Sequence, residues 1–394
     1  MPTSPAALTL LCHADVHAPE PLGLRHLLLG GGKLLWMGQQ IPDLPFDMQR
    51  VDLGGRRLVP GFIDMHAHVT GGGGEAGAHT KVPPVPLSHF ARGGVTTVVG
   101  LLGTDDITRS TKELVTAIHG LRNEGLNAFG FTGGYHFPPT TLTGSVRGDL
   151  AFVECLIGAG ELAISDHRSS QPTLDEFLRL AADVHVGGLM TGKAGILHLH
   201  LGDGPRGLAL VREALDRSEI PPRVFNPTHV NRRKALFEEA IVLARRGCTV
   251  DLTAFPVDAG DDAWTAAEGL TRFLASDAPP ERITISTDGG GCLPTFDSDG
   301  MVTRMGIGSP SAIAETLRQL LEAGEPLARI LPAFTVNPAR LLRFGKKGRV
   351  AVGADADLVV LSTTGLPQDV LIAGQWFVRD SVPVRHGTFE ERPS

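Results

Sequence analysis

Residues 58–68 read LVPGFIDMHAH, a short apolar run that ends in two histidines separated by one residue. Its length and composition fit a buried strand of a parallel sheet. Because the side chains of a strand alternate between its two faces, His66 and His68 project on the same side. A His-x-His pair alone is equally compatible with two ordinary histidines, so its meaning depends on how the rest of the chain is organised.

Seven more strand-like runs follow, with amphipathic helical patterns between them. The runs are VTTVVGL, NAFGFT, ELAIS, GILHLHL, RVFNPTHV, TVDLT and ITISTD. The helical patterns include ITRSTKELVTAIHGLRNEG, TLDEFLRLAADVH, KALFEEAIVLARRG and SAIAETLRQLLEAG, with glycine near several helix ends. Eight consecutive βα units predict an α/β fold of the (β/α)₈ TIM-barrel type in preference to an open sheet. In such barrels the chemistry lies at the carboxyl ends of the strands.

The two ends of the chain have a different pattern, of short strands separated by Gly and Asp turns. Examples are LTLLCHADV and HLLLGGGKLLWMG near the start, and GRVAVGADADLVVLS and QDVLIAGQWFVRDSVPV near the end. We therefore predict that residues 1–57 and 346–394 together form a small β-sandwich domain. Residues 58–345 then form the catalytic barrel.

Composition excludes several classes of protein. Of 394 residues, 42% are hydrophobic and 20% charged, as in ordinary globular proteins, and the net charge of −7 includes no basic block that would fit a nucleic-acid partner. No apolar run reaches the roughly 20 residues needed to cross a membrane. The start, MPTSPAALTLLCHADVHAPE, lacks a basic leader, and the four cysteines form no CxxC pair. We expect a cytoplasmic protein without membrane or nucleic-acid partners.

Further metal-binding side chains occur at the ends of other predicted strands. His200 ends the run LHLH, His229 follows NPT, and Asp288 follows IST. Together with His66 and His68 they bring four imidazoles and one carboxylate to one mouth of the barrel. This set suits one or two divalent ions such as Zn²⁺, and its placement at four strand ends by chance is improbable.

This constellation resembles the amidohydrolase superfamily and, within it, the isoaspartyl dipeptidases of bacteria. The resemblance covers essentially the full chain, both β-rich ends included. It rests on PGFIDMHAH, GGGGEAG at 71–77, VVGLLGTD at 98–105, TGGYH at 132–136, LTGS at 142–145, AISDHRS at 163–169, PTHVNR at 227–232 and STDGGG at 286–291. The first motif is common to many amidohydrolases, whereas GGGGEAG together with TGGYH and AISDHRS is far more selective.

The resemblance implies two divalent ions, with Zn²⁺ expected, held by His66, His68, His200, His229 and Asp288. Family members usually bridge the ions with a carboxylated lysine on the fourth strand, where this chain has Glu161. Glutamate offers the same bidentate carboxylate on a shorter stem, so we expect Glu161 to be the bridge. The alternative is that Glu161 ends a strand and that one metal binds. Lys193, in TGKAG, is expected to be structural.

The resemblance also implies a substrate site around the mouth. Tyr135, the single tyrosine of the chain, would donate a hydrogen bond to a developing oxyanion. Glu75, in a four-glycine loop, would bind the free ammonium of a dipeptide, and Arg168 and Arg232 would bind its carboxylates. Thr104 is a further candidate contact. Without the resemblance, Glu75 would be interpreted as a solvated loop carboxylate. Arg168 and Arg232 would then be equally compatible with carboxylate binding and with ordinary exposed arginines.

Two more positions near the strand ends carry expectations. Where the family generally has a serine that helps to hold the substrate carboxylate, this chain has Cys292. We expect Cys292 to line the pocket, to anchor the carboxylate more weakly, and to make the enzyme sensitive to thiol reagents. His198, two residues before His200, is expected to be a hydrogen-bonded histidine of the barrel interior.

These assignments predict a binuclear metal-dependent dipeptidase that hydrolyses the amide bond of β-aspartyl dipeptides. The metals would supply hydroxide near neutral pH, while Asp288 would take up a proton and later deliver one to the leaving amine. Other amidohydrolase activities stay open, namely a cyclic-amide hydrolase or an N-acyl-amino-acid deacylase, as does a catalytically silent metal-binding paralogue. The resemblance further implies a homo-oligomer, an octamer.

Overall fold

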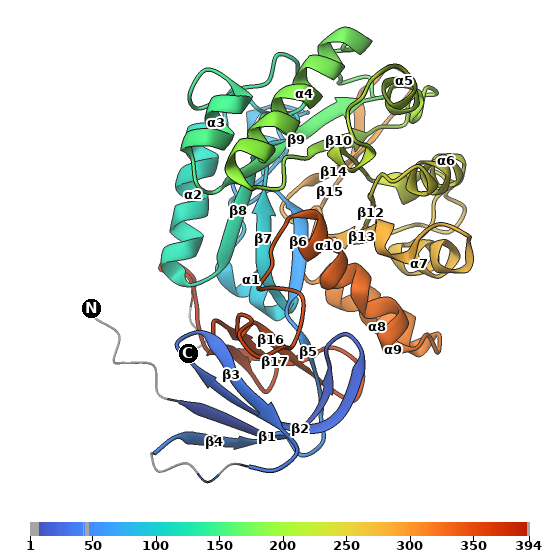
Figure 1. The fold of residues 1–394 in the computed structure, drawn as a ribbon. Coiled ribbons are helices and arrows are strands. Elements are labelled where there is room, and N and C mark those ends of the chain that lie inside the picture. The colour runs from blue at the N-terminus through green and yellow to red at the C-terminus, as the bar shows by residue number, and fades with distance from the viewer. Residues whose placement is uncertain (1–7, 42, 44–46, 392–394) are drawn as a thin grey trace.

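A curled parallel sheet forms the centre of the computed structural model, which describes residues 8–41, 43 and 47–391 (Figure 1). Two hydrogen-bonded groups of strands, in chain order, build it: β6 (Phe62–Ala67), β7 (Val95–Gly100), β8 (Asn127–Thr132), β9 (Leu156–Ile164), β10 (Leu197–Leu201) and β11 (Phe225–Thr228), then β12 (Val250–Thr253) and β13 (Ile283–Ser286). A parallel bridge between Ala67 and Gly289 returns the chain after β13 to β6. The predicted α/β fold with a barrel-like parallel sheet is confirmed.

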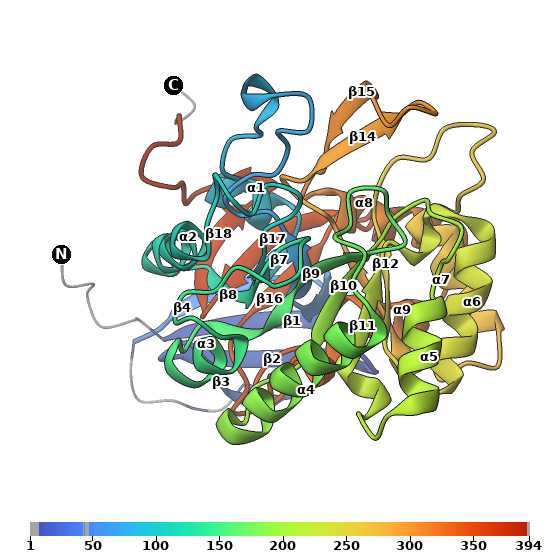
Figure 2. The same ribbon diagram turned by 90° about the horizontal axis from the view of Figure 1, so that it is seen from above.

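Helices connect the strands and cover the outside of the curled sheet (Figures 1 and 2). They are α1 (Leu87–Arg92), α2 (Thr111–Glu124), α3 (Val146–Phe152), α4 (Leu174–Thr191), α5 (Ala209–Arg217), α6 (Lys234–Arg245), α7 (Ala266–Ala275), α8 (Ala312–Glu322), α9 (Leu327–Ile330) and α10 (Val336–Leu341). Short 3₁₀ helices are η1 (Ala78–Thr80), η2 (Pro222–Val224), η3 (Val230–Arg232), η4 (Pro280–Arg282) and η5 (Leu331–Phe334). Capping boxes begin α4 and α7, where the side chains of Thr173 and Thr265 accept from the backbone of Glu176 and Glu268.

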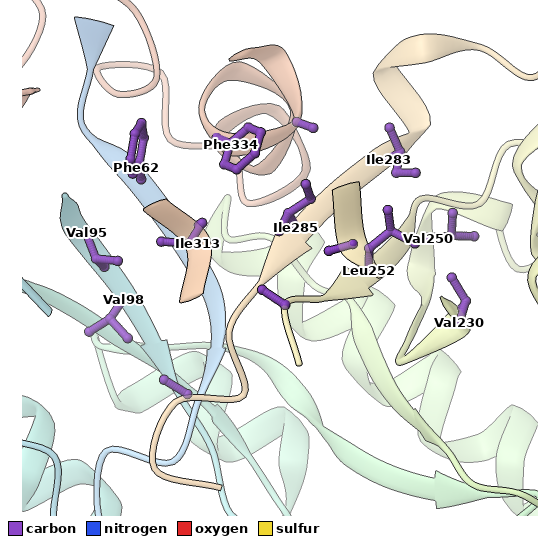
Figure 3. Packing of buried hydrophobic residues seen from close by; sticks show 14 of the residues in the cluster. Phe62, Val95, Val98, Val230, Val250, Leu252, Ile283, Ile285, Ile313 and Phe334 are labelled. Carbon is purple, nitrogen blue, oxygen red and sulfur yellow. The ribbon is translucent and has the colours of Figure 1, made fainter. Parts of the chain in front are cut away.

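Strands β6 and β7 are buried along their whole length, because one face points into the barrel and the other lies under helices. Phe62 of β6 packs outward against Phe334 of η5, with ring centres 5.8 Å apart. Figure 3 shows these rings beside Ile313 of α8 and the aliphatic side chains of the neighbouring strands. This continuous apolar layer fixes the strands whose far ends carry the polar site.

Both ends of the chain build a second sheet, which lies below the barrel in Figure 1. Its strands are β1 (Thr9–His17), β2 (Pro21–Gly30), β3 (Lys33–Gly38), β4 (Gln49–Asp52), β5 (Arg57–Pro60), β16 (Leu358–Leu361), β17 (Pro367–Ile372), β18 (Gln375–Arg379) and β19 (Val382–Pro383). The two chain ends meet where β16 pairs with β5. Among the described residues these strands form one hydrogen-bonded sheet, so the pairing does not divide them into the two sheets of a sandwich. The boundaries at 57/58 and 345/346 stay predictions.

A hairpin that no sequence signal indicated follows β13. It consists of β14 (Cys292–Phe296) and β15 (Val302–Ile307), paired antiparallel, and Figure 2 shows it projecting away from the curled sheet. Because it leaves from the carboxyl end of β13, it extends one wall of the barrel mouth. Within the part of the chain that the structure describes, no helix combines the length and apolarity needed to span a membrane.

Replacing Phe334 with alanine should open a cavity against Phe62 and lower the free energy of unfolding by about 3–5 kcal/mol. Urea denaturation of Phe334→Ala against the wild-type protein measures this loss. Phe389→Ala is the matched control, because the Phe389 side chain is 98% exposed and its removal should change stability by less than about 0.5 kcal/mol. Equal effects of the two substitutions would contradict the packing described.

Candidate active site

The carboxyl ends of the barrel strands open into one cavity of about 810 Å³. Two of the predicted ligands have left-handed backbones: His229, directly after β11, with φ of 59°, and Asp288, two residues after the end of β13, with φ of 51°. This turn aims each side chain into the mouth instead of along the strand. The backbone after β13 is held against β6, since the N–H of Asp288 donates to the carbonyl of His66 and the N–H of His68 donates to the carbonyl of Gly289.

His66, His68 and Asp288 form one group of converging ligand atoms. Oδ1 of Asp288 lies 3.4 Å from Nε2 of His66 and 3.1 Å from Nε2 of His68. All three residues are buried, and their nearest ligand atoms lie within 4.8 Å of one another. Two imidazole nitrogens and one carboxylate oxygen at this spacing can hold a divalent cation.

Glu161 of β9 lies between this group and the remaining histidines. Its Oε1 lies 3.4 Å from Nε2 of His68, while its Oε2 lies 3.2 Å from Nδ1 of His200 and 3.4 Å from Nε2 of His229. The two oxygens of one carboxylate therefore face different histidines. This is the arrangement that a carboxylate needs in order to bridge two cations, and no lysine nitrogen takes part in these contacts.

Buried polar atoms without partners support a cation at this position. Among the described residues, Nε2 of His66 and Oδ1 of Asp288 make no hydrogen bond although both are buried, and such atoms normally require a partner. Burial alone lowers the pKa of His68, but Asp288 and Glu161 raise it to about 9. A divalent ion would replace the protons that these carboxylates attract, so the donor set fits a metal centre.

The histidines of the candidate centre keep the carboxyl groups of Glu161 and Asp288 ionised. Burial alone would raise the pKa of Glu161, but His66, His200 and His229 hold it well below its usual range. Asp288 behaves in the same way, since His66 and His68 outweigh its burial and lower its pKa. Both carboxylates are therefore anionic and available as ligands.

Asp166, which the sequence reasoning missed, supports the centre from behind. Its Oδ2 lies 3.0 Å from Nε2 of His200 and accepts from Nη2 of Arg168 at 2.8 Å. A carboxylate behind a ligating histidine orients the ring and increases its basicity. Asp166 stands inside the quoted motif AISDHRS, so the signal was present, but no strand-end spacing distinguished it.

Glu75 enters the cavity from the glycine-rich loop after β6. Its Oε1 accepts from the hydroxyl of Thr104 at 3.2 Å and from Nη1 of Arg168 at 3.5 Å. Its Oε2 is buried and has no hydrogen-bond partner among the described residues. Glu75 and Arg168 thus lie together in the cavity wall, and Thr104 contacts Glu75.

Tyr135 lies beside the candidate centre. Its hydroxyl is 2.8 Å from Nδ1 of His200, and its ring faces the guanidinium of Arg168, whose central carbon lies 5.3 Å from the ring centre. Burial raises the pKa of Tyr135 well above its usual value. The phenol therefore stays protonated and can act as a hydrogen-bond donor.

Arg232 and Cys292 line the outer part of the cavity. Nε of Arg232 pairs with Oδ1 of Asp203 at 3.1 Å, whereas Arg168 pairs with Glu75. Cys292 begins β14 and is partly buried. Burial, together with Glu75 and Asp288, raises the pKa of its thiol to about 12.

The hairpin supplies a cavity wall that the sequence did not reveal. Phe296 of β14 covers Arg168, with the guanidinium carbon 5.0 Å from the ring centre. Arg304 of β15 pairs with Asp258 at 2.7 Å, which ties the hairpin to the loop after β12. Arg233 also lines the cavity, next to Arg232. The hairpin and the loops around it carry these residues, and no periodic pattern in the sequence predicts their positions.

Known proteins match both the sequence and this geometry. Residues 57–378 match the model of the amidohydrolase family. A crystal structure of a β-aspartyl dipeptidase from Fervidobacterium islandicum AW-1, in complex with β-Asp-Leu, is 41% identical, with 97% of this chain and 98% of that chain covered and a TM-score of 0.90. A curated deacetylase of Agrobacterium fabrum, Atu3266, is 25% identical over 85% of this chain and 77% of its own length. A crystal structure of a D-hydantoinase shares the fold at 17% identity, with 97% of each chain covered and a TM-score of 0.66.

The family model covers most of the chain, and the dipeptidase structure covers nearly all of it at well above 30% identity. The resemblance found in the sequence motifs is thereby confirmed. The chain belongs to the amidohydrolase family and, within it, groups with the β-aspartyl dipeptidases.

Proposed function

We propose that this enzyme hydrolyses the amide bond of β-aspartyl dipeptides. The observation that carries the proposal is the buried Oε2 of Glu75, which lacks a partner among the described residues and lies in the same cavity as the candidate metal centre. A free α-ammonium group would supply such a carboxylate with a charge-assisted hydrogen bond. The β-Asp-Leu complex of the similar dipeptidase from Fervidobacterium islandicum supports the same class of substrate.

The proposed centre holds two ions. One ion would be bound by His66, His68 and Asp288 and the other by His200 and His229, with Glu161 as the shared carboxylate. Bound divalent ions polarise a carbonyl group and lower the pKa of water toward neutrality. Zn²⁺ suits this mixture of imidazole and carboxylate ligands.

The chain's own groups complete the reaction. Asp288, whose carboxylate is anionic, takes up a proton during attack and returns it to the leaving amine. Tyr135 keeps its phenolic proton and donates a hydrogen bond to the oxygen that becomes negative. Tyr135 also lies near Arg168, so the proposed oxyanion donor and a proposed carboxylate-binding residue are neighbours in the cavity wall.

The charged groups at the two ends of the dipeptide would be bound by side chains of opposite charge. Glu75 binds the α-ammonium, and Arg168 and Arg232 bind carboxylates. Thr104 holds Oε1 of Glu75 and leaves Oε2 free for the ligand. Burial, together with Glu75 and Asp288, raises the pKa of the Cys292 thiol, so the neutral thiol would face the substrate.

Other amidohydrolase activities would use the same metal ligands. A deacylase or a cyclic-amide hydrolase acts on a nitrogen that is already acylated, so its substrate would leave Oε2 of Glu75 without a partner. Turnover of β-Asp-Leu compared with α-Asp-Leu and dihydroorotate distinguishes these activities. The expectations of Zn²⁺, of a homo-octamer and of a cytoplasmic location stay predictions.

Glu161→Gln should remove the anionic bridge while it preserves size, so the purified protein should contain much less divalent metal than the wild-type protein. Metal analysis by mass spectrometry measures the content, and Glu75→Gln is the control that should keep it. Because no carbamate has to form, bicarbonate should not change reconstitution. Full metal content in Glu161→Gln would exclude Glu161 as the bridge.

N-acetylation of β-Asp-Leu should lower kcat/KM at least about tenfold, because it removes the cation that pairs with Glu75. Glu75→Gln, of equal size, should shrink this discrimination, whereas Tyr135→Phe should lower kcat for both substrates alike. Steady-state kinetics on the two substrates measures the ratios. A wild-type preference for the acetylated substrate would replace the dipeptidase proposal with the deacylase one.

Cys292 should react slowly with iodoacetamide at neutral pH, contrary to the sensitivity expected from the sequence. With a pKa of about 12, only roughly one thiol in 10⁵ is ionised at pH 7, and the thiolate is the reactive form. The alkylation rate should rise about tenfold per pH unit between pH 7 and 10. Mass spectrometry of the peptide that contains Cys292 follows the rate, and reaction at pH 7 as fast as free cysteine would refute the assignment.

A further inference from the structure

His198 of β10 lies in the barrel interior next to the proposed metal ligand His66. It is fully buried, and the centres of the two rings are 5.0 Å apart. The mechanism above does not use His198. Its hydrogen bonds nevertheless connect it to His66 on one side and to Asn226 of β11 on the other.

The orientation of Asn226 is determined by the backbone. Nδ2 of Asn226 donates to the carbonyl oxygen of Thr249 at 2.7 Å. Since a carbonyl can only accept, the amide nitrogen must face Thr249 and the amide oxygen must face His198. That oxygen lies 2.6 Å from Nδ1 of His198, so Nδ1 of His198 carries the proton.

The same reasoning extends to His66. Nε2 of His198 lies 2.8 Å from Nδ1 of His66, so one of these two nitrogens donates to the other. A second proton on His198 would make it a cation in a fully buried position, where its hydrogen-bond partners are an amide and an imidazole. Nε2 of His198 therefore accepts, and Nδ1 of His66 donates.

We infer that His198 and Asn226 are positioning residues that select the tautomer of His66 whose Nε2 keeps its lone pair. This nitrogen is the one that faces Asp288 and Glu161 at 3.4 and 3.5 Å. The inference rests on the metal centre of the proposed function. Starting at the backbone of Thr249, each hydrogen bond fixes the position of the next proton, so Nε2 of His66 is already free of a proton before an ion binds.

His229 provides a useful contrast. Its Nδ1 lies 2.7 Å from the hydroxyl of Thr253, and a hydroxyl can donate or accept. That contact therefore accommodates either tautomer of His229. The path through His198 accommodates one tautomer of His66, because Asn226 cannot turn without losing its bond to Thr249.

The first test compares His198→Phe with Phe131→Leu. Phenylalanine keeps a ring of similar size but cannot accept from His66, whereas Phe131, whose ring centre lies 5.2 Å from that of His198, only packs against it. Competition with a chelator should show that His198→Phe lowers the affinity for the Zn²⁺ ion held by His66 about 10–100-fold. Phe131→Leu should bind both ions as the wild-type protein does. Wild-type affinity in a folded His198→Phe, or equal losses in both variants, would overturn the inference.

The second test is made on the wild-type protein, so it does not depend on whether His198→Phe folds. In the Zn²⁺-loaded wild-type protein with ¹⁵N-labelled histidine, NMR should show His198 protonated at Nδ1 and bare at Nε2. The signals are assigned by their loss in His198→Gln. A proton on Nε2 of His198 would overturn the inference, whatever the variants do. Turnover of β-Asp-Leu is assayed separately: a wild-type protein that binds Zn²⁺ without turnover contradicts the dipeptidase proposal but not the role of His198.

Discussion

The buried carboxylate of Glu161 constrains everything around it. An isolated carboxylate at this depth would be strongly destabilised, so it must be surrounded by groups that can share its charge. Four imidazoles surround it: those of His66 on β6, His68 directly after β6, His200 on β10 and His229 directly after β11. The barrel makes such an arrangement possible, because a curled parallel sheet brings strand ends that are distant in the sequence to one point.

Around the candidate centre, a polar group contacts one nitrogen of each of three histidine rings. Asp166 takes one nitrogen of His200, Thr253 one nitrogen of His229, and His198 one nitrogen of His66. Each ring then presents its other nitrogen toward Glu161. The apolar layer of Phe62 and Phe334 on the outside of the sheet keeps the strands in the register that these contacts need.

Arg168 connects the proposed metal ligands to Glu75, the proposed ammonium-binding residue. It pairs with Asp166 behind His200 and with Glu75 in the glycine-rich loop, and the ring of Phe296 covers it. One guanidinium therefore contacts both Asp166, which lies behind His200, and Glu75. Oε2 of Glu75 has no hydrogen-bond partner among the described residues, so it is available to a donor that enters the cavity.

Local sequence determined the strands, most helices and the ligand positions, because buried strands and their terminal polar residues leave a regular pattern within a few residues. As proposed ligands, His66, His68, His200, His229 and Asp288 could be named from this pattern, whereas Glu161 was named only through the resemblance to the amidohydrolases. Only the tertiary structure decided which residues stand behind the ligands, as with Asp166 and Asn226, and that the hairpin at 292–307 forms a wall. These contacts join segments far apart in the chain, so they depend on barrel closure and loop packing, for which no sequence period exists.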